Sequence, residues 1–150
     1  RQGEAQRVKE VIAQAPDLVN QPDARGFYPL VLAAYYDQAE MVALLLQLGA
    51  DPEVKDGSGN TALMGASFKG FTASVETLIT NGAQIDNQNA EGATALAFAS
   101  MFDQEAVAKL LLEHGADPLL KDHKGNTPYD QARLKGLRWA KAAFELYVNK

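Results

Sequence analysis

The chain has 150 residues, of which 47% are hydrophobic, and its 14 basic and 19 acidic residues give a formal net charge of −5. This composition excludes a disordered tract and predicts one compact domain with a buried core. The absence of cysteine excludes a disulfide framework, a thiolate metal site and a cysteine nucleophile.

The first predicted element is a helix within residues 3–21, where Val8, Val11 and Ile12 recur at helical spacing. We expect it to be the second half of a structural repeat whose first helix is absent from the sequence. Because the chain begins at Arg1 rather than at methionine, an upstream piece is expected, and a removed signal peptide stays open.

A fixed period organises the rest of the chain. A glycine followed by alanine recurs every 33 residues, at Gly49, Gly82 and Gly115. A second glycine recurs with the same period, at Gly26, Gly59, Gly92 and Gly125. An aspartate or asparagine precedes each of these by three residues, at Asp23, Asp56, Asn89 and Asp122. Such residues favour turns, so a turn is predicted once per period.

Each period also predicts two helices. The first helix follows a threonine suited to cap it, at Thr61, Thr94 and Thr127, and Pro29 and Pro128 suit a first helical turn. Its buried stripe joins a leucine to small residues three and four positions later, as in Leu30, Ala33 and Ala34. The second helix ends at the glycine of the Gly-Ala pair in a left-handed conformation, and Gly82 and Gly115 are expected to lie buried between repeats.

These motifs resemble those of the ankyrin family, which reads Thr-Pro-Leu-His-x-Ala-Ala early and Leu-Leu-x-x-Gly-Ala-Asp late in each repeat. The resemblance covers the whole chain and implies an all-α solenoid of antiparallel helix pairs with projecting β-turn fingers. It implies a single ankyrin-repeat domain over residues 1–150. Its parts are a partial repeat at 1–22, full repeats at 23–55, 56–88 and 89–121, and a C-terminal capping repeat at 122–150.

The chain departs from the family at two kinds of position. The motif histidine is replaced by Val31, Met64, Ala97 and Asp130, so any hydrogen-bond network that it makes between repeats is missing. Asp37 and Asp103 stand where Gly70 and Gly136 keep the usual glycine, and aspartate tolerates the left-handed conformation better than most residues.

The candidate binding surface is the face of each first helix opposite its buried stripe, which in the family lines a concave groove. Counting two, five and six residues after the motif leucine, a helical wheel places on it Leu32, Tyr35 and Tyr36, then Gly65, Phe68 and Lys69, then Phe98, Met101 and Phe102. Exposed aromatic and methionine side chains are typical of contact surfaces. We therefore predict partner contacts from Tyr35, Tyr36, Phe68, Lys69, Met101 and Phe102. The predicted rim consists of turn residues Phe27, Arg25, Ser58, Asn60 and Glu91. For Leu32 and Phe98, filling gaps between repeats is an open alternative.

Catalysis, metal binding and cofactor binding are not predicted. Residues 57–62 fit the glycine pattern of a dinucleotide-binding turn, but the other repeats carry a plain turn there, so a structural role is favoured. His114 and His123 have no cysteine or second histidine at ligand spacing.

The predicted function is therefore a protein-protein interaction module that binds a protein or peptide. A passive scaffold segment of a longer protein stays open, and a cryptic enzyme is the least favoured alternative. Residues 1–120 carry 7 basic and 16 acidic side chains, which disfavours nucleic acid as a partner. Residues 121–150 carry 7 basic and 3 acidic side chains, interpreted as a polar cap or, alternatively, as a contact for an acidic partner. We expect a monomer without membrane insertion, and a cytoplasmic location is favoured over an exported or periplasmic one.

Overall fold

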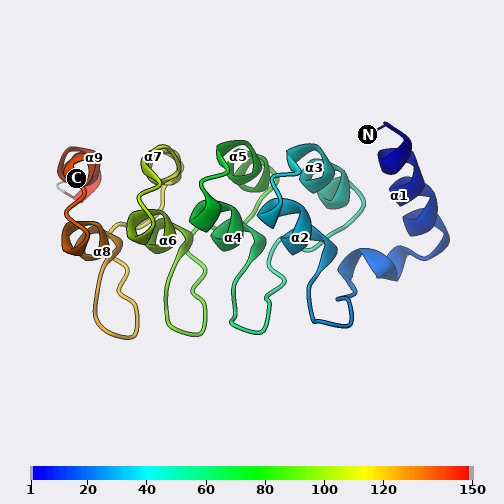
Figure 1. Cartoon of the computed structure of the whole chain (residues 1–150), viewed down its shortest axis with the longest axis horizontal. Helices are drawn as coiled ribbons and strands as arrows, with labels where there is room; N and C mark the ends of the chain where they lie inside the picture. Colours follow the sequence, from blue (N-terminus) through cyan, green and yellow to red (C-terminus); the bar gives the residue numbers. More distant parts are fainter. Residues whose placement is uncertain (1, 149–150) are drawn as a thin grey trace.

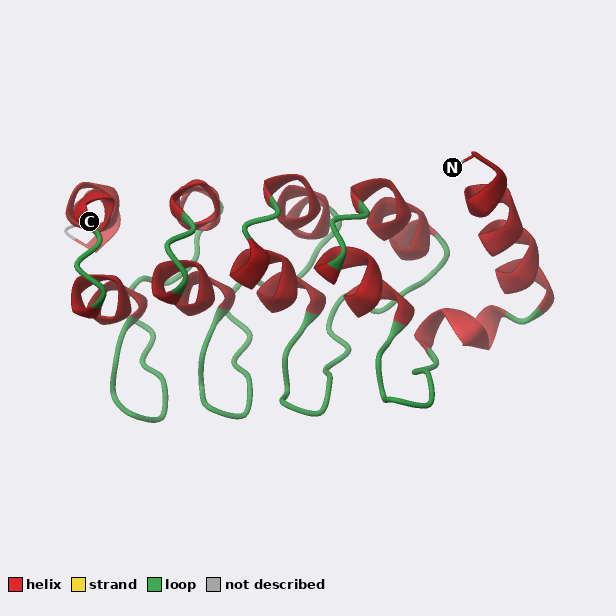
Figure 2. Ribbon diagram, in the orientation of Figure 1, coloured by secondary structure: helices red, strands yellow, loops and turns green. Residues whose placement is uncertain are grey.

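The computed structural model describes residues 2–148 and arranges them as helices stacked side by side in one row, with loops projecting to one side (Figure 1). The inner row, next to the loops, consists of α2 (Pro29–Tyr35), α4 (Ala62–Lys69), α6 (Ala95–Met101) and α8 (Pro128–Leu134). The outer row consists of α3 (Ala39–Gln47), α5 (Thr72–Thr80), α7 (Glu105–Glu113) and α9 (Arg138–Val148). Helix α1 (Gln2–Gln14) and the 3₁₀ helix η1 (Pro16–Asn20) precede the first pair. The described residues contain no strand, and the predicted all-α solenoid is confirmed (Figure 2).

The inner helices begin at the predicted threonine caps. The Thr94 hydroxyl accepts the Ala97 N–H at 3.2 Å, and Thr127 accepts the Asp130 N–H at 3.0 Å. Tyr28 holds the equivalent position before α2, where it makes no side-chain cap and its ring packs against the core. A hydroxyl close to its own backbone can satisfy an end N–H group, and the tyrosine hydroxyl lies too far out to do so.

The predicted left-handed positions are confirmed, but one expectation about them is wrong. Asp37 and Asp103 have φ angles of 55° and 57°, in the same region as Gly70 at 78°. Gly115 also has a positive φ, of 93°, yet it is exposed rather than buried, and an added Cβ would meet nothing within 4 Å. Gly82 is likewise exposed, because the chain leaves each outer helix over open solvent.

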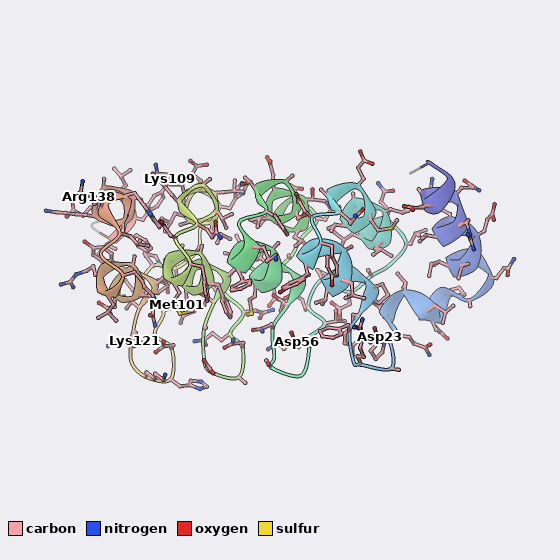
Figure 3. The ribbon with its side chains drawn as sticks, in the orientation of Figure 1. Asp23, Asp56, Met101, Lys109, Lys121 and Arg138 are labelled. Atoms are coloured by element: carbon pink, nitrogen blue, oxygen red, sulfur yellow. The ribbon has the colours of Figure 1, made fainter. Side chains whose placement is uncertain are left out.

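The projecting loops, called fingers below, are turns closed by the predicted aspartate or asparagine. An Asp56 carboxylate oxygen accepts the N–H groups of Ser58 and Asn60, both at 2.9 Å. Neighbouring fingers are also joined, since the Ala90 N–H donates to the Ser58 carbonyl at 3.1 Å. Figure 3 labels Asp23 and Asp56 on two adjacent fingers, with Lys109 and Arg138 on the outer row away from them.

The core runs continuously between the rows of helices. Leu30, Leu63 and Leu96 are each 1% exposed, as expected for the buried stripe of the inner helices. At the C-terminal end Phe144 is fully buried and stacks on Tyr129, with ring centroids 5.1 Å apart. Helix α9 therefore closes the core at this end.

Candidate functional site

The predicted binding face contains a groove of about 370 Å³ between α2, α4 and α6 and the bases of their fingers. We call it the concave groove. Its lining residues are Phe27, Val31, Leu32, Tyr35, Asp56, Asn60, Thr61, Met64, Gly65, Phe68 and Phe98. Most of these side chains are apolar or aromatic, so the groove offers a surface suited to another apolar group.

The groove exists because one inner helix lacks a side chain where its neighbours have large ones. Leu32, Gly65 and Phe98 hold the same position in three successive repeats. Leu32 and Phe98 are half-buried and stand on either side of the gap left by Gly65. A Cβ added at Gly65 would meet only the Tyr35 ring within 4 Å, at 3.7 Å, which is an ordinary contact. The floor of the groove is therefore open above Gly65.

Three phenylalanine rings form one side of the site. Phe68 meets Phe102 edge to face, with centroids 4.4 Å apart and ring planes at 78°, and meets Phe98 at 6.5 Å. Phe102 is still 47% exposed. Edge-to-face contacts of this kind hold ring orientations, so the cluster presents a fixed apolar wall to solvent.

The opposite side combines an aromatic ring with a positive charge. The Lys69 ammonium lies 4.9 Å from the centroid of the Tyr35 ring and 5.8 Å from that of Phe71. Such contacts favour one side-chain conformation of Lys69. The ion pairs found among the described residues do not include Lys69, which is exposed.

The structure separates two predicted contact residues, Tyr36 and Met101, from the concave groove. Tyr36 touches Tyr35 edge to face at 5.6 Å, but it is 65% exposed and lines a different groove, next to α1. Met101 is half-buried on α6 and is not among the residues that line the concave groove. Tyr35 and Phe68 both line the concave groove, and Phe102 joins it through Phe68.

The predicted rim residues also divide between the groove and the turns. Phe27 and Asn60 line the groove, and the Arg25 guanidinium lies over the Phe27 ring at 5.4 Å. Ser58 and Glu91 lie at finger tips, where their carbonyl oxygens accept N–H groups of the next finger at 3.1 and 2.9 Å. The backbone carbonyls of Ser58 and Glu91 therefore join neighbouring fingers.

Part of the groove lining was not predicted from the sequence. Val31 and Met64, treated only as replacements of the motif histidine, belong to the lining, and Leu32 and Phe98 both pack against the core and line the groove. The amino-acid sequence does mark the groove, because the same repeat position carries a large side chain at Leu32, none at Gly65 and a large one again at Phe98.

The histidine and acidic side chains of residues 2–148 do not gather into one cluster. No group of three or more histidine, aspartate and glutamate side chains there could hold a metal ion. The Phe27 N–H that donates to Asp23 lowers the pKa of this carboxyl below its ordinary value, as expected for a turn residue. Within the described range, no helix is long and apolar enough to cross a bilayer.

Comparison with known proteins agrees with this architecture. A family model described as ankyrin repeats in three copies matches residues 1–89, 30–122 and 63–138. The chain belongs to the ankyrin-repeat family. Ankyrin repeats generally mediate contacts between proteins, and the family is typically non-enzymatic.

Relatives of different overall length share these repeats. The putative ankyrin repeat protein YahD of Escherichia coli is 28% identical, over 91% of this chain and 87% of that protein. The human DNA-binding protein RFXANK is 42% identical over 46% of this chain, which corresponds to 26% of RFXANK. Mouse ankyrin repeat and SAM domain-containing protein 6 is 36% identical over 89% of this chain and 12% of its own length. The chain thus spans a small part of two of these proteins.

Proposed function

We propose that this ankyrin-repeat chain binds an extended segment of a partner protein and takes one large apolar side chain of that segment into the concave groove. The observation that carries the proposal is the gap above Gly65, walled by Tyr35 on one side and Phe68 on the other. An apolar side chain that enters this gap is largely removed from water and contacts aromatic rings. Side chains so enclosed dominate the energies of protein interfaces.

The charge beside the groove favours an acidic group next to that apolar side chain. Lys69 stands over Tyr35 at the groove edge and is exposed. A carboxylate of the partner can approach Lys69 without displacing a carboxylate of the chain, since none pairs with it among the described residues. Charge complementarity of this kind contributes to specificity and association rate.

Binding to nucleic acid is not part of the proposal. The name of human RFXANK describes DNA binding by that protein, but residues 1–120 of this chain, which include the groove, have 16 acidic and 7 basic side chains. Such a balance repels phosphate groups.

The test compares two substitutions at one position. A phage library of random peptides is selected on the wild-type chain, and the selected peptides are measured against the wild type, Gly65→Ala and Gly65→Leu. Alanine adds only the Cβ that makes the 3.7 Å contact with Tyr35, whereas leucine projects into the groove as Leu32 does in the preceding repeat. Both substitutions favour a helix over glycine by up to about 1 kcal/mol, so neither should unfold the chain.

We expect the selected peptides to share one large apolar residue and to bind Gly65→Leu at least about 30-fold more weakly than wild type, the loss that a hot spot of about 2 kcal/mol gives. Gly65→Ala should retain binding within a few fold. Equal affinity of the peptides for wild type and a folded Gly65→Leu variant would refute the proposal.

A further inference from the structure

One hydrogen-bond acceptor at the concave groove is not used by the described part of the chain. The first carboxylate oxygen of Asp56, Oδ1, accepts the N–H groups of Ser58 and Asn60 and so closes its finger. The second oxygen, Oδ2, accepts no hydrogen bond within residues 2–148, although Asp56 is half-buried and lines the groove. A carboxylate oxygen at a largely apolar groove is a strong acceptor for an N–H group that enters.

In the other three fingers the equivalent atom is engaged within the chain. Asp122 Oδ2 accepts the Gln131 side-chain amide at 3.1 Å. Asp23 Oδ2 lies 3.4 Å from an arginine guanidinium nitrogen. Asn89 has an amide nitrogen at this place, and it donates to the Asn60 side-chain oxygen at 2.8 Å. The unused oxygen in the groove is therefore a departure from the repeat.

The glycine beneath the groove explains why this acceptor is unused. Gln131 lies nine residues after Asp122, on α8, and the residue nine positions after Asp56, on α4, is Gly65. Gln131 extends its amide from the inner helix to the finger, whereas Gly65 leaves the same path open. The gap above Gly65 thus leads to Asp56 Oδ2 as the Gln131 side chain leads to Asp122. A group from outside can donate where the chain does not.

We propose that the side chain held by the concave groove is tryptophan and that its indole N–H donates to Asp56 Oδ2. This inference rests on the proposed function and specifies the residue that the groove takes. The indole rings supply apolar surface for contact with Tyr35 and Phe68, and the N–H supplies the missing donor. The chain contains the same pairing elsewhere, since the Trp139 indole N–H donates to an Asp103 carboxylate oxygen at 2.8 Å.

Other large side chains match the groove less well. Leucine, methionine and phenylalanine fill the gap but shield Asp56 Oδ2 from water without providing a donor, which costs free energy. Arginine and lysine can reach the carboxylate, but the Lys69 ammonium, 4.9 Å from the Tyr35 ring centroid, repels a second cation beside this ring. Tyrosine adds a hydroxyl oxygen that needs a donor of its own. Tryptophan joins an uncharged donor to an apolar body without adding an acceptor.

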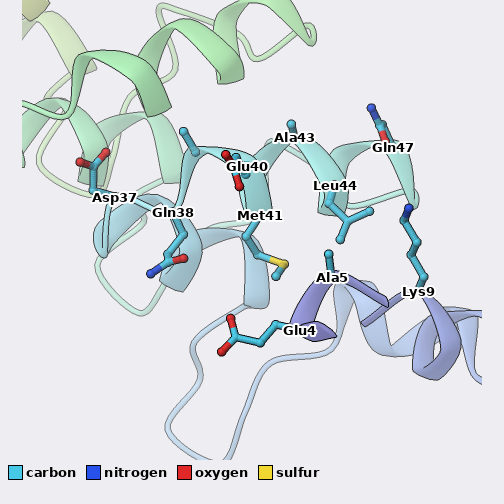
Figure 4. Close-up of a pocket in the computed structure, with 11 residues that line it drawn as sticks. Glu4, Ala5, Lys9, Asp37, Gln38, Glu40, Met41, Ala43, Leu44 and Gln47 are labelled. Atoms are coloured by element: carbon cyan, nitrogen blue, oxygen red, sulfur yellow. The ribbon is translucent and has the colours of Figure 1, made fainter. Parts of the chain in front are cut away.

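The phage-selected peptides are measured against Asp56→Asn. This substitution should keep the turn, because Asn89 closes another finger with its Oδ1, which accepts the N–H groups of Glu91 and Ala93 at 3.0 and 2.9 Å. It replaces only the acceptor Oδ2, by an amide nitrogen that is itself a donor. Glu40→Gln is the control for loss of one negative charge, since Glu40 lies at a separate hollow between α1 and α3 (Figure 4). Urea denaturation checks that every variant is folded.

Each tryptophan peptide is also made with benzothienylalanine in place of tryptophan, which keeps the fused rings and replaces the N–H with sulfur. We expect the selected peptides to carry tryptophan as their shared apolar residue and to bind Asp56→Asn about tenfold more weakly than wild type. The benzothienylalanine peptides should bind wild type about tenfold more weakly than the tryptophan peptides do, and should bind Asp56→Asn as they bind wild type. Glu40→Gln should change all affinities by less than about twofold.

The outcomes separate this inference from the proposed function. Peptides that place another side chain in the groove and lose affinity in Gly65→Leu would overturn the tryptophan assignment while the proposed function stands. Tryptophan peptides that bind a folded Asp56→Asn chain as tightly as wild type would overturn it as well. So would equal losses of the tryptophan and benzothienylalanine peptides in Asp56→Asn, because the loss would not come from the N–H. Peptides insensitive to both Gly65→Leu and Asp56→Asn would refute the proposed function and this inference with it.

A test of the geometry does not depend on the peptides. Gly65→Gln gives α4 the side chain that α8 has at Gln131, and its amide should donate to Asp56 Oδ2 as Gln131 donates to Asp122. A crystal structure of this variant should show that hydrogen bond. Tryptophan peptides should bind it at least about tenfold more weakly than wild type, because the acceptor and the gap are both occupied. An introduced glutamine that points away from Asp56 would show that the gap does not lead to this oxygen and would overturn the inference.

Discussion

The Phe102→Ser substitution should separate binding from folding, and its cost can be worked out from the environment of the ring. Phe102 is 47% exposed, so it gains roughly half of the 1.5 to 3 kcal/mol that full burial of such a side chain contributes. Its edge-to-face contact with Phe68 at 4.4 Å adds about 0.5 to 1.5 kcal/mol. We therefore expect the free energy of unfolding to fall by roughly 1 to 3 kcal/mol.

The assay combines urea denaturation with the affinity of the phage-selected peptides. Leu96→Ala removes a side chain that is 1% exposed and should cost about 2 to 5 kcal/mol. Leu134→Ser is the control for loss of an exposed apolar side chain, since Leu134 is 74% exposed on α8, and it should change stability by less than about 0.5 kcal/mol. Only Phe102→Ser should both remain folded and weaken peptide binding, by roughly tenfold or more if the phenylalanine wall belongs to the interface.

Two results would count against this reasoning. Unfolding of Phe102→Ser at the level of Leu96→Ala would place Phe102 in the core rather than on the binding face. Unchanged peptide affinity in a folded Phe102→Ser chain, matching Leu134→Ser, would remove the phenylalanine wall from the site. Affinity lost through Gly65→Leu alone would then confine the site to the gap between Tyr35 and Phe68.

Three further predictions concern stability and charge. In urea denaturation, Gly59→Ala should lower the free energy of unfolding by about 1 to 3 kcal/mol more than Gly26→Ala does. Both glycines have a positive φ, but only at Gly59 would an added Cβ meet the next finger, at 2.9 Å. Equal losses in the two variants would disprove this clash. The hydrogen bond donated by the Thr127 N–H lowers the pKa of Asp130 below its ordinary value of 3.8, so the stability it provides is present above about pH 4 and disappears as the pH falls through the lowered value. Denaturation between pH 2 and 7 should therefore show a shallower acid loss in Asp130→Asn than in wild type, and parallel curves would contradict this. If the basic residues of 121–150 only keep the last repeat solvated, replacing Lys135, Arg138 and Lys141 with glutamate should change neither the peptide affinity nor its salt dependence. Slower peptide association at low salt would instead show that these residues contact the partner.

The period, the helix ends and the turns of this protein could all be predicted from its amino-acid sequence. These features depend on short-range chemistry: Thr94 caps a helix through an N–H three residues later, and Asp56 closes a turn through N–H groups two and four residues later. Left-handed φ angles at Asp37 and Asp103 follow from the same local preferences. Because each 33-residue unit repeats this chemistry, the solenoid could be predicted without knowing any long-range distance.

Which side chains share a surface could not be predicted in this way, because it depends on the folded arrangement of the helices. Tyr35 and Tyr36 are adjacent in sequence and both were predicted to face the partner, yet Tyr35 lines the concave groove and Tyr36 lines the groove next to α1. Gly26 and Gly59 hold the same repeat position, but only the second lies against a neighbouring finger. Gly115, expected in the core, is exposed. These differences depend on which residues lie beside each position in space, and that is decided by how helices and fingers pack together rather than by the neighbours of a residue in sequence.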